Sequence, residues 1–176
     1  MLIAKRNAIF FPGIDNIARL RDECDMTQER YVEICDSHTV NFHTLKAQLE
    51  YLKGCCKNEL EFYTVLLLAG MDTNIYATGG KMHLEKPILL TDFDNWDRVD
   101  NEFNFTQDEL QRICDRYAQQ TRETDFRQMP LKKQIEILHW CCNNDPHFYV
   151  MLANIGMATQ NWLYVNTEVN DKLGIE

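Results

Sequence analysis

The densest group of residues able to do chemistry is His139-Trp140-Cys141-Cys142, followed by His147. Thiolate and imidazole groups are proper zinc ligands. A cysteine beside a histidine is also the arrangement of a nucleophile and its base. A further candidate is Gly79-Gly80-Lys81, a fragment of the glycine-rich loop that binds nucleotide phosphates.

The elements that would position these residues occur twice, because the sequence contains an internal duplication. A shift of 79 positions places residues 9–36 over 88–115 with 10 of 28 positions identical, and a shift of 86 places 45–73 over 131–159 with 14 of 29 identical. Chance would give roughly 3 to 4 identities in all. The period suits a small domain, so we expect two helical domains, residues 1–80 and 81–176, with the boundary near residues 77–81.

Comparison of the two copies weighs against each chemical candidate. Where the second copy has His139 and His147, the first has Lys53 and Glu61, although both copies keep their cysteine pairs. A metal site would have kept its histidines, so we expect the cysteines to pack in the core, where a thiol is unreactive. No predicted strand precedes Gly79, as a phosphate loop requires. We therefore expect no catalytic site, metal or cofactor, and a small zinc- or cysteine-dependent enzyme is the least favoured alternative.

Composition narrows the class further. The 18 Lys and Arg residues face 27 Asp and Glu, and the net charge of −9 disfavours direct binding to nucleic acid. The most apolar stretch is broken by Gly70 and Asp72, far short of the roughly 20 residues that span a bilayer. The N-terminus lacks the pattern of a secretory signal, and the seven cysteines are an odd number. We expect reduced thiols and a cytoplasmic, or alternatively nuclear, location.

Apolar spacing predicts an all-α fold. The stripe Leu45, Leu49, Leu52 and Cys56 recurs as Leu131, Ile135, Leu138 and Cys142, and each stripe should face a core.

We expect N-caps at Thr27, Thr106, Asn58 and Asp145, with capping boxes at Thr106-Glu109 and Asn58-Glu61. The central Phe-Tyr helix should end at Gly70 or Gly156. Opening helices near 2–11 and 81–90 and closing helices near 73–78 and 159–166 would give six per copy, with cores filled by Trp96, Trp140 and Trp162.

The order of these segments resembles a death-fold domain, specifically a caspase recruitment domain. MTQERYVEIC and FTQDELQRIC fill the slot of the third helix, LKAQLEYLKGCC and LKKQIEILHWCC the fourth, and ELEFYTVLLLAG and PHFYVMLANIG the fifth. Death-effector and pyrin domains share much of this pattern. Tandem recruitment domains precede the helicase in RIG-I-like and Dicer-related helicases, so the resemblance implies two six-helix bundles in an adaptor that brings signalling or RNA-silencing proteins to a helicase. The alternative is a freestanding inhibitor with the same fold, for example a viral one.

The resemblance also implies a mechanism. Such domains have no active site and associate, with partners or with themselves, through complementary charged surfaces. The first copy offers acidic Asp22, Glu23, Asp25 and Glu29 and basic Lys46, Lys53 and Lys57; the second offers Asp97, Asp100 and Glu102 against Arg112, Arg116, Lys132 and Lys133. For each of these residues the alternative is an ordinary solvated surface.

Overall fold

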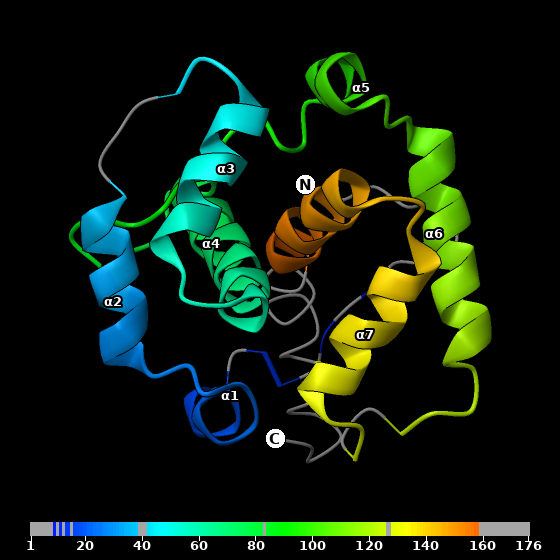
Figure 1. Cartoon of the computed structure of the whole chain (residues 1–176), viewed down its shortest axis with the longest axis horizontal. Coiled ribbons are helices and arrows are strands. Elements are labelled where there is room, and N and C mark those ends of the chain that lie inside the picture. The colour runs from blue at the N-terminus through cyan, green and yellow to red at the C-terminus, as the bar shows by residue number, and fades with distance from the viewer. Residues whose placement is uncertain are drawn as a thin grey trace.

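The computed structural model describes residues 9, 11, 13–14, 16–38, 42–82, 84–125 and 128–158. Within these ranges the chain forms α-helices and no strand, which confirms the all-α prediction. The helices are α1 (Ile17–Cys24), α2 (Gln28–Ser37), α3 (Leu45–Cys55), α4 (Glu59–Ala77), α5 (Trp96–Phe103), α6 (Gln107–Gln120), α7 (Leu131–Cys141) and a last helix described over residues 145–158 (Figure 1).

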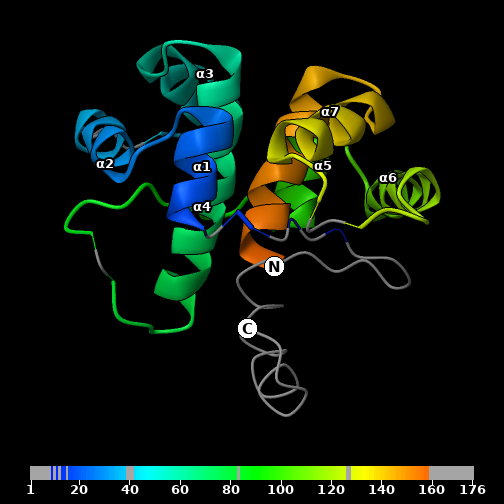
Figure 2. The ribbon, with the colours of Figure 1, turned by 90° about the horizontal axis from the view of Figure 1, so that it is seen from below.

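The helices follow the duplication one by one. The first four correspond in order to α5, α6, α7 and helix 145–158. Figure 2 shows α2 and α3 on one side of the molecule and α6 and α7 on the other, with α4 and helix 145–158 between them. The two copies therefore take equivalent places around the pair of central helices.

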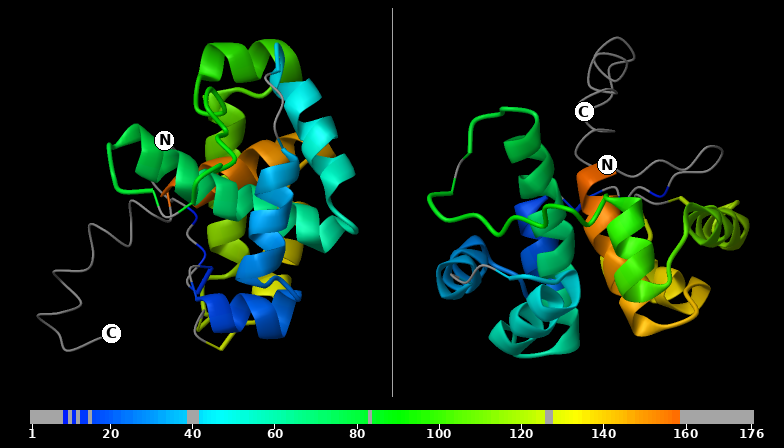
Figure 3. Two further views of the ribbon diagram at one scale, coloured as in Figure 1. Left: turned by 90° about the vertical axis from the view of Figure 1, so that its left-hand side faces the viewer. Right: turned by 90° about the horizontal axis from the view of Figure 1, so that it is seen from above.

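The first helix of each copy packs on the other copy. α1 contacts α7 as well as α4, and α5 contacts α3. Figure 3 shows α1 and α5 at opposite ends of the molecule, so this packing of a first helix on the other copy occurs at both ends. One cluster of buried hydrophobic residues includes side chains from both copies, and its largest members include Phe11, Phe62, Phe93, Phe105 and Phe148. The core is thus not divided at residue 80.

Most of the predicted helix caps are present. Thr27, Thr106 and Asn58 each accept a hydrogen bond from the backbone N–H three residues on. The predicted cap at Asp145 is wrong by one residue: Asn144, the equivalent of Asn58, accepts from the N–H of His147 at 2.9 Å. The glutamates of the two predicted capping boxes bind arginine side chains, and Glu61 also turns back to accept from the backbone N–H of Lys57, one residue before the cap.

Six helices per copy are not observed, since the described residues hold four in each. Residues 84–90 are not helical, and alternate positions Ile88 and Leu90 are fully buried, as in an extended segment laid on the core. The closing helix expected at 73–78 is the continuous end of α4. The expected helix at 159–166 and most of the one at 2–11 lie outside the described residues.

The central helices do not end at Gly70 and Gly156; both run through their glycine. A Cβ atom on Gly70 would collide with the carbonyl oxygen of Ala153 and lie 3.0 Å from the Cα of Gly156. A Cβ atom on Gly156 would collide in the same way with the carbonyl oxygen of Leu67, the equivalent of Ala153. The glycines are therefore the point where the two central helices cross in backbone contact.

Candidate functional site

An Arg-Glu pair on α1 holds the start of α7. The guanidinium of Arg19 binds the carboxylate of Glu23 and donates to the carbonyl oxygen of Met129. Glu23 in turn accepts a hydrogen bond from the backbone N–H of Leu131 at 2.7 Å. Since Pro130 gives α7 no side-chain cap, this carboxylate satisfies a free N–H at the positive end of the helix.

The second copy repeats this contact in the opposite direction. Arg98 pairs with Glu102 at 3.1 Å and donates to the carbonyl oxygen of His43 at 2.7 Å. Glu102 accepts hydrogen bonds from the backbone N–H groups of Leu45 and Lys46, both at 3.1 Å. Arg98 and Glu102 are the equivalents of Arg19 and Glu23. Two residues predicted to bind partners, Glu23 and Glu102, are therefore engaged in joining the copies.

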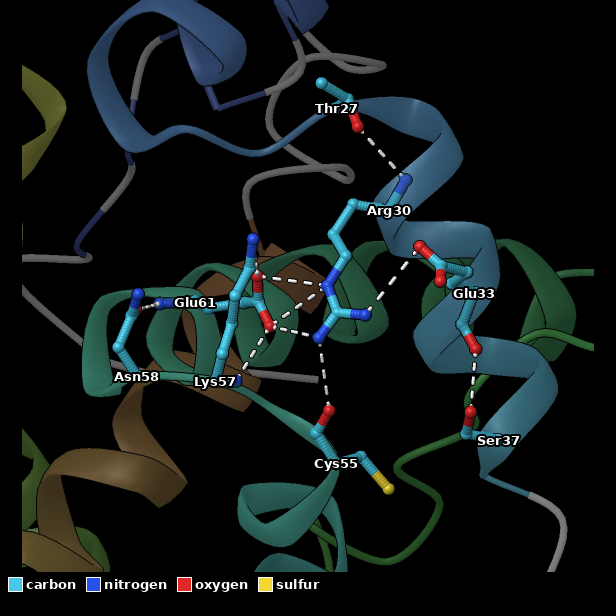
Figure 4. A network of polar contacts seen from close by, with 8 residues as sticks. All are labelled: Thr27, Arg30, Glu33, Ser37, Cys55, Lys57, Asn58 and Glu61. Carbon is cyan, nitrogen blue, oxygen red and sulfur yellow. Dashed lines mark hydrogen bonds and ion pairs between the residues drawn. The ribbon is translucent and has the colours of Figure 1, made fainter.

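A partly buried ion pair fixes α2 to the start of α4. The guanidinium of Arg30 reaches the carboxylate of Glu61 at 2.7 Å, and the same carboxylate accepts from the N–H of Lys57 (Figure 4). Burial alone would raise the pKa of Glu61, but the hydrogen bonds from Arg30 and Lys57 outweigh it, so the pKa lies below its usual value. Arg30 also donates to the carbonyl oxygen of Cys55.

The second copy binds the same carbonyl with a different arginine. Arg116 donates to the carbonyl oxygen of Cys141, the equivalent of Cys55. Glu109 stands at the position of Arg30, and it pairs with Arg112 at 2.6 Å and with Arg116 at 3.6 Å. The second helix of each copy thus supplies an arginine to the end of the third helix, but from a different position in each copy. Arg116, another predicted partner residue, is partly committed to this internal role.

Four aromatic rings join the starts of the two central helices. Phe62 packs edge-on against Tyr149 at 5.0 Å, and Tyr63 packs edge-on against Phe148 at 4.9 Å. The Nζ atom of Lys53 lies 5.7 Å from the ring centre of Tyr149 and donates to its hydroxyl at 3.4 Å. These edge-to-face contacts favour a rigid junction.

The histidines considered as zinc ligands have separate structural contacts. His139 lies 2.8 Å from the carboxylate of Asp145, and its ring stacks on Phe148 at 4.1 Å. His147 is buried and its Nε2–H donates to the carbonyl oxygen of Phe103 at 2.9 Å. In the described part of the chain, no three His, Cys, Asp or Glu residues are grouped so that they could hold a metal ion.

All seven cysteines lie in the described residues and are free thiols. Burial is the main reason that the pKa of each thiol is raised, to about 11 for Cys35 and to about 12 for Cys56 and Cys114. A raised thiol pKa keeps the sulfur protonated at neutral pH. The thiols are therefore poor nucleophiles.

The remaining charged residues predicted to bind partners are exposed on several helices rather than gathered in one place. Arg21 pairs with Asp22, and Lys133 pairs with Glu136 at 3.6 Å. The exposed residues are Asp22, Asp25 and Glu29 near α1 and α2, Lys46, Lys53 and Lys57 on or after α3, Asp97 and Asp100 on α5, Arg112 on α6, and Lys132 and Lys133 on α7.

The outward side of α7 carries the most exposed large hydrophobic residue of the described chain. Trp140 is 70% exposed, so the prediction that it fills a core is wrong. It follows Lys132 and Glu136 at intervals of four residues, so the three lie on one side of the helix. The other side of α7 is buried through Leu131, Gln134, Ile135, Leu138 and Cys141. Copy one has Gly54 at the position of Trp140. The two copies therefore do not share a large side chain at this position, as they do at positions that face the core.

An apolar pocket of about 370 Å³ lies between α1, α2 and the second half of α4. Its walls include Ile17, Leu20, Met26, Leu68, Met71 and Ile75. Ile17 stands at its edge and is 54% exposed. We call this cavity the α1–α4 pocket. The pocket could not be predicted from the sequence, because its wall residues come from several segments of the chain and resemble ordinary core residues.

Comparisons with protein-family models, with curated proteins and with solved structures gave no match to this chain. Among the helices of the described residues, none combines the length and apolar character needed to cross a membrane.

Proposed function

We propose that the chain is a non-catalytic protein-interaction module and that the outward side of α7, centred on Trp140, binds another protein. The observation that carries this proposal is the 70% exposure of Trp140 on a helix whose other side is well buried. Exposing a large aromatic side chain to water is unfavourable, and tryptophan is enriched among the residues that dominate binding energy at protein interfaces.

The surroundings of Trp140 suit such a role. Lys132, Lys133 and Glu136 are exposed on the same helix and would form a polar rim around the aromatic residue. The raised pKa values of the thiols and the structural contacts of His139 and His147 favour binding over catalysis. As the biological setting we propose that of tandem recruitment domains: an adaptor that brings signalling or RNA-silencing proteins to a helicase. The length of the parent open reading frame tests this setting.

The test of the interaction surface is quantitative binding with matched variants. Proteins captured from the native source would be identified, purified and titrated calorimetrically against the wild type, Trp140→Ala and Tyr76→Ala. Tyr76 is 57% exposed on α4 and serves as the control aromatic residue. We expect Trp140→Ala to weaken binding by about 2 kcal/mol, or about 30-fold, and Tyr76→Ala to leave it unchanged.

Charge reversal gives a second, independent readout. Lys132→Glu should slow association and alter its salt dependence more than it alters dissociation, as expected for a charge at the rim of an interface. Circular dichroism of each variant would confirm an unchanged fold. Equal affinity of the wild type and Trp140→Ala for every purified partner would rule out the α7 surface.

A further inference from the structure

We propose that the α1–α4 pocket of one molecule receives Trp140 of a second copy of this chain, so that molecules associate head to tail. The inference rests on the proposed function, because it uses the same side of α7 and names its partner. The pocket and Trp140 belong to different helices and different copies of the repeat.

The second copy of the repeat indicates what the pocket would hold. Trp96 occupies the position of Ile17, and Phe105 occupies the position of Met26. The two aromatic rings pack together at 5.6 Å, and Phe105 is fully buried. In copy one the smaller Ile17 and Met26 leave the space between α1, α2 and α4 open. A tryptophan side chain supplied from outside would therefore restore an aromatic contact of the kind that copy two makes from its own residues.

The charges around the two surfaces are complementary. Near the pocket, Arg21 pairs with Asp22, and exposed Asp25 and Glu29 leave an excess of negative charge. On the outward side of α7, Lys132 and Lys133 stand against one carboxylate, Glu136, which pairs with Lys133, so Lys132 leaves an excess of positive charge there. Opposite charges would orient two copies before the aromatic residue enters the pocket.

A contact between two different surfaces is heterologous, so it leaves one free pocket and one free Trp140 on every dimer. Such contacts propagate into rings or open chains rather than stopping at a symmetric dimer. This geometry separates the proposal from an ordinary two-fold dimer. It also means that a molecule with only one working surface would end the chain.

Sedimentation velocity of the whole chain tests this inference. The wild type should rise in mass above the 20.8 kDa monomer as its concentration increases. Trp140→Ala removes the inserted residue, and Ile17→Trp copies the residue of the second repeat and fills the pocket. Each variant alone should stay monomeric, whereas an equimolar mixture should form a 1:1 complex and nothing larger, because one variant keeps the pocket and the other keeps Trp140. Tyr76→Ala should assemble like the wild type.

Several outcomes would overturn the inference. A wild type that remains monomeric up to about 1 mM excludes even a weak contact. Assembly that survives in Trp140→Ala, or a mixture of the two variants that remains monomeric while the wild type assembles, would show a different interface. If the wild type is monomeric but Ile17→Trp abolishes binding to a captured protein, the pocket belongs to that partner. In that case the second copy is excluded, while the proposed function of α7 is still judged by the titrations with Trp140→Ala.

Discussion

The carboxylate of Glu23 accepts a hydrogen bond from the backbone N–H of Leu131 at 2.7 Å and so joins the first helix of one copy to the third helix of the other. The equivalent Glu102 makes the same contact with Leu45 in the reverse direction. A carboxylate near the first turn of a helix is stabilised by the free N–H groups and by the helix dipole. This reciprocal pair therefore stabilises the packing of the two copies on each other.

Glu23→Ala should lower the free energy of unfolding by about 1–2 kcal/mol, as the loss of a helix cap does. Glu102→Ala should cost less, because α3 keeps its own cap at Thr44, whereas α7 has none. Urea denaturation followed by circular dichroism would measure both. The control is Asp22→Ala, an exposed neighbour of Glu23 that should change stability by no more than about 0.5 kcal/mol. Equal losses for Glu23 and Asp22 would contradict the capping role.

Gly70→Ala should be among the most damaging single substitutions, costing on the order of 4 kcal/mol or preventing folding. The added methyl group would collide with backbone atoms of helix 145–158, and backbone atoms cannot move aside as the end of a flexible side chain can. Gly54→Ala is the matched control, because no atom lies within 4 Å of its added Cβ and the residue is in α3. That substitution should stabilise the protein by up to about 1 kcal/mol. The midpoints of thermal unfolding of the two variants would compare the two sites. An unchanged midpoint for Gly70→Ala would mean that the central helices do not touch at this glycine.

Glu61→Gln should destabilise the protein by about 2 kcal/mol at neutral pH, since it removes charge-assisted hydrogen bonds to Arg30. The pKa of Glu61 is lower in the folded state than in the unfolded chain. Its contribution is therefore complete above the unfolded value and is lost as the pH falls through the folded value. The stability difference between wild type and Glu61→Gln should shrink below about pH 4.5. Glu33→Gln is the control: its side chain is 71% exposed, and it should have little effect at any pH.

The seven thiols should react slowly with Ellman's reagent in the folded protein and quickly in urea, because burial raises their pKa values. Cys55, which is only half-buried, should react before Cys35 or Cys114. The raised thiol pKa values also make the stability of the fold depend on pH in alkaline solution. The unfolded chain ionises its thiols near pH 9 while the folded protein keeps them protonated, so stability should fall as the pH rises above 9. One thiol that reacts in the folded state as fast as a free cysteine would contradict this.

The sequence predicted the features that depend on neighbours along the chain. The caps at Thr27, Thr106 and Asn58 and the all-α class follow from local spacing and are present. The apolar stripes of α3 and α7 are buried at their first three positions, but their last members, Cys56 and Cys142, lie just beyond the helix ends and are only partly buried. The helix expected at 81–90 is wrong, because its apolar residues alternate toward the core in an extended segment. Short apolar runs fit either structure, and only the surrounding core decides between them.

The features that join the copies required the structure. A glycine that ends a helix and a glycine where two helices touch look alike in sequence, so Gly70 and Gly156 were interpreted as ends. Arg19 and Glu23 are identical in the second copy, as Arg98 and Glu102. This identity could have predicted the contact between the copies. Surface residues usually diverge after a duplication, so charged residues that stay identical in both copies indicate a structural contact. Trp140 gave no such signal, since its counterpart is Gly54.

The shared core makes a prediction about the two repeat units. Residues 1–80 alone would leave exposed the side of α1 that packs on α7 and the start of α3 that Glu102 binds. Residues 81–176 alone would leave α7 without its only observed cap, which Glu23 supplies. We expect each fragment to be largely unfolded and an equimolar mixture to recover the helical circular dichroism spectrum, with a midpoint of thermal unfolding that rises with concentration. If residues 1–80 instead unfold cooperatively as a monomer at a concentration-independent temperature, each repeat is an independent domain, and the reciprocal caps only fix how two finished domains are placed.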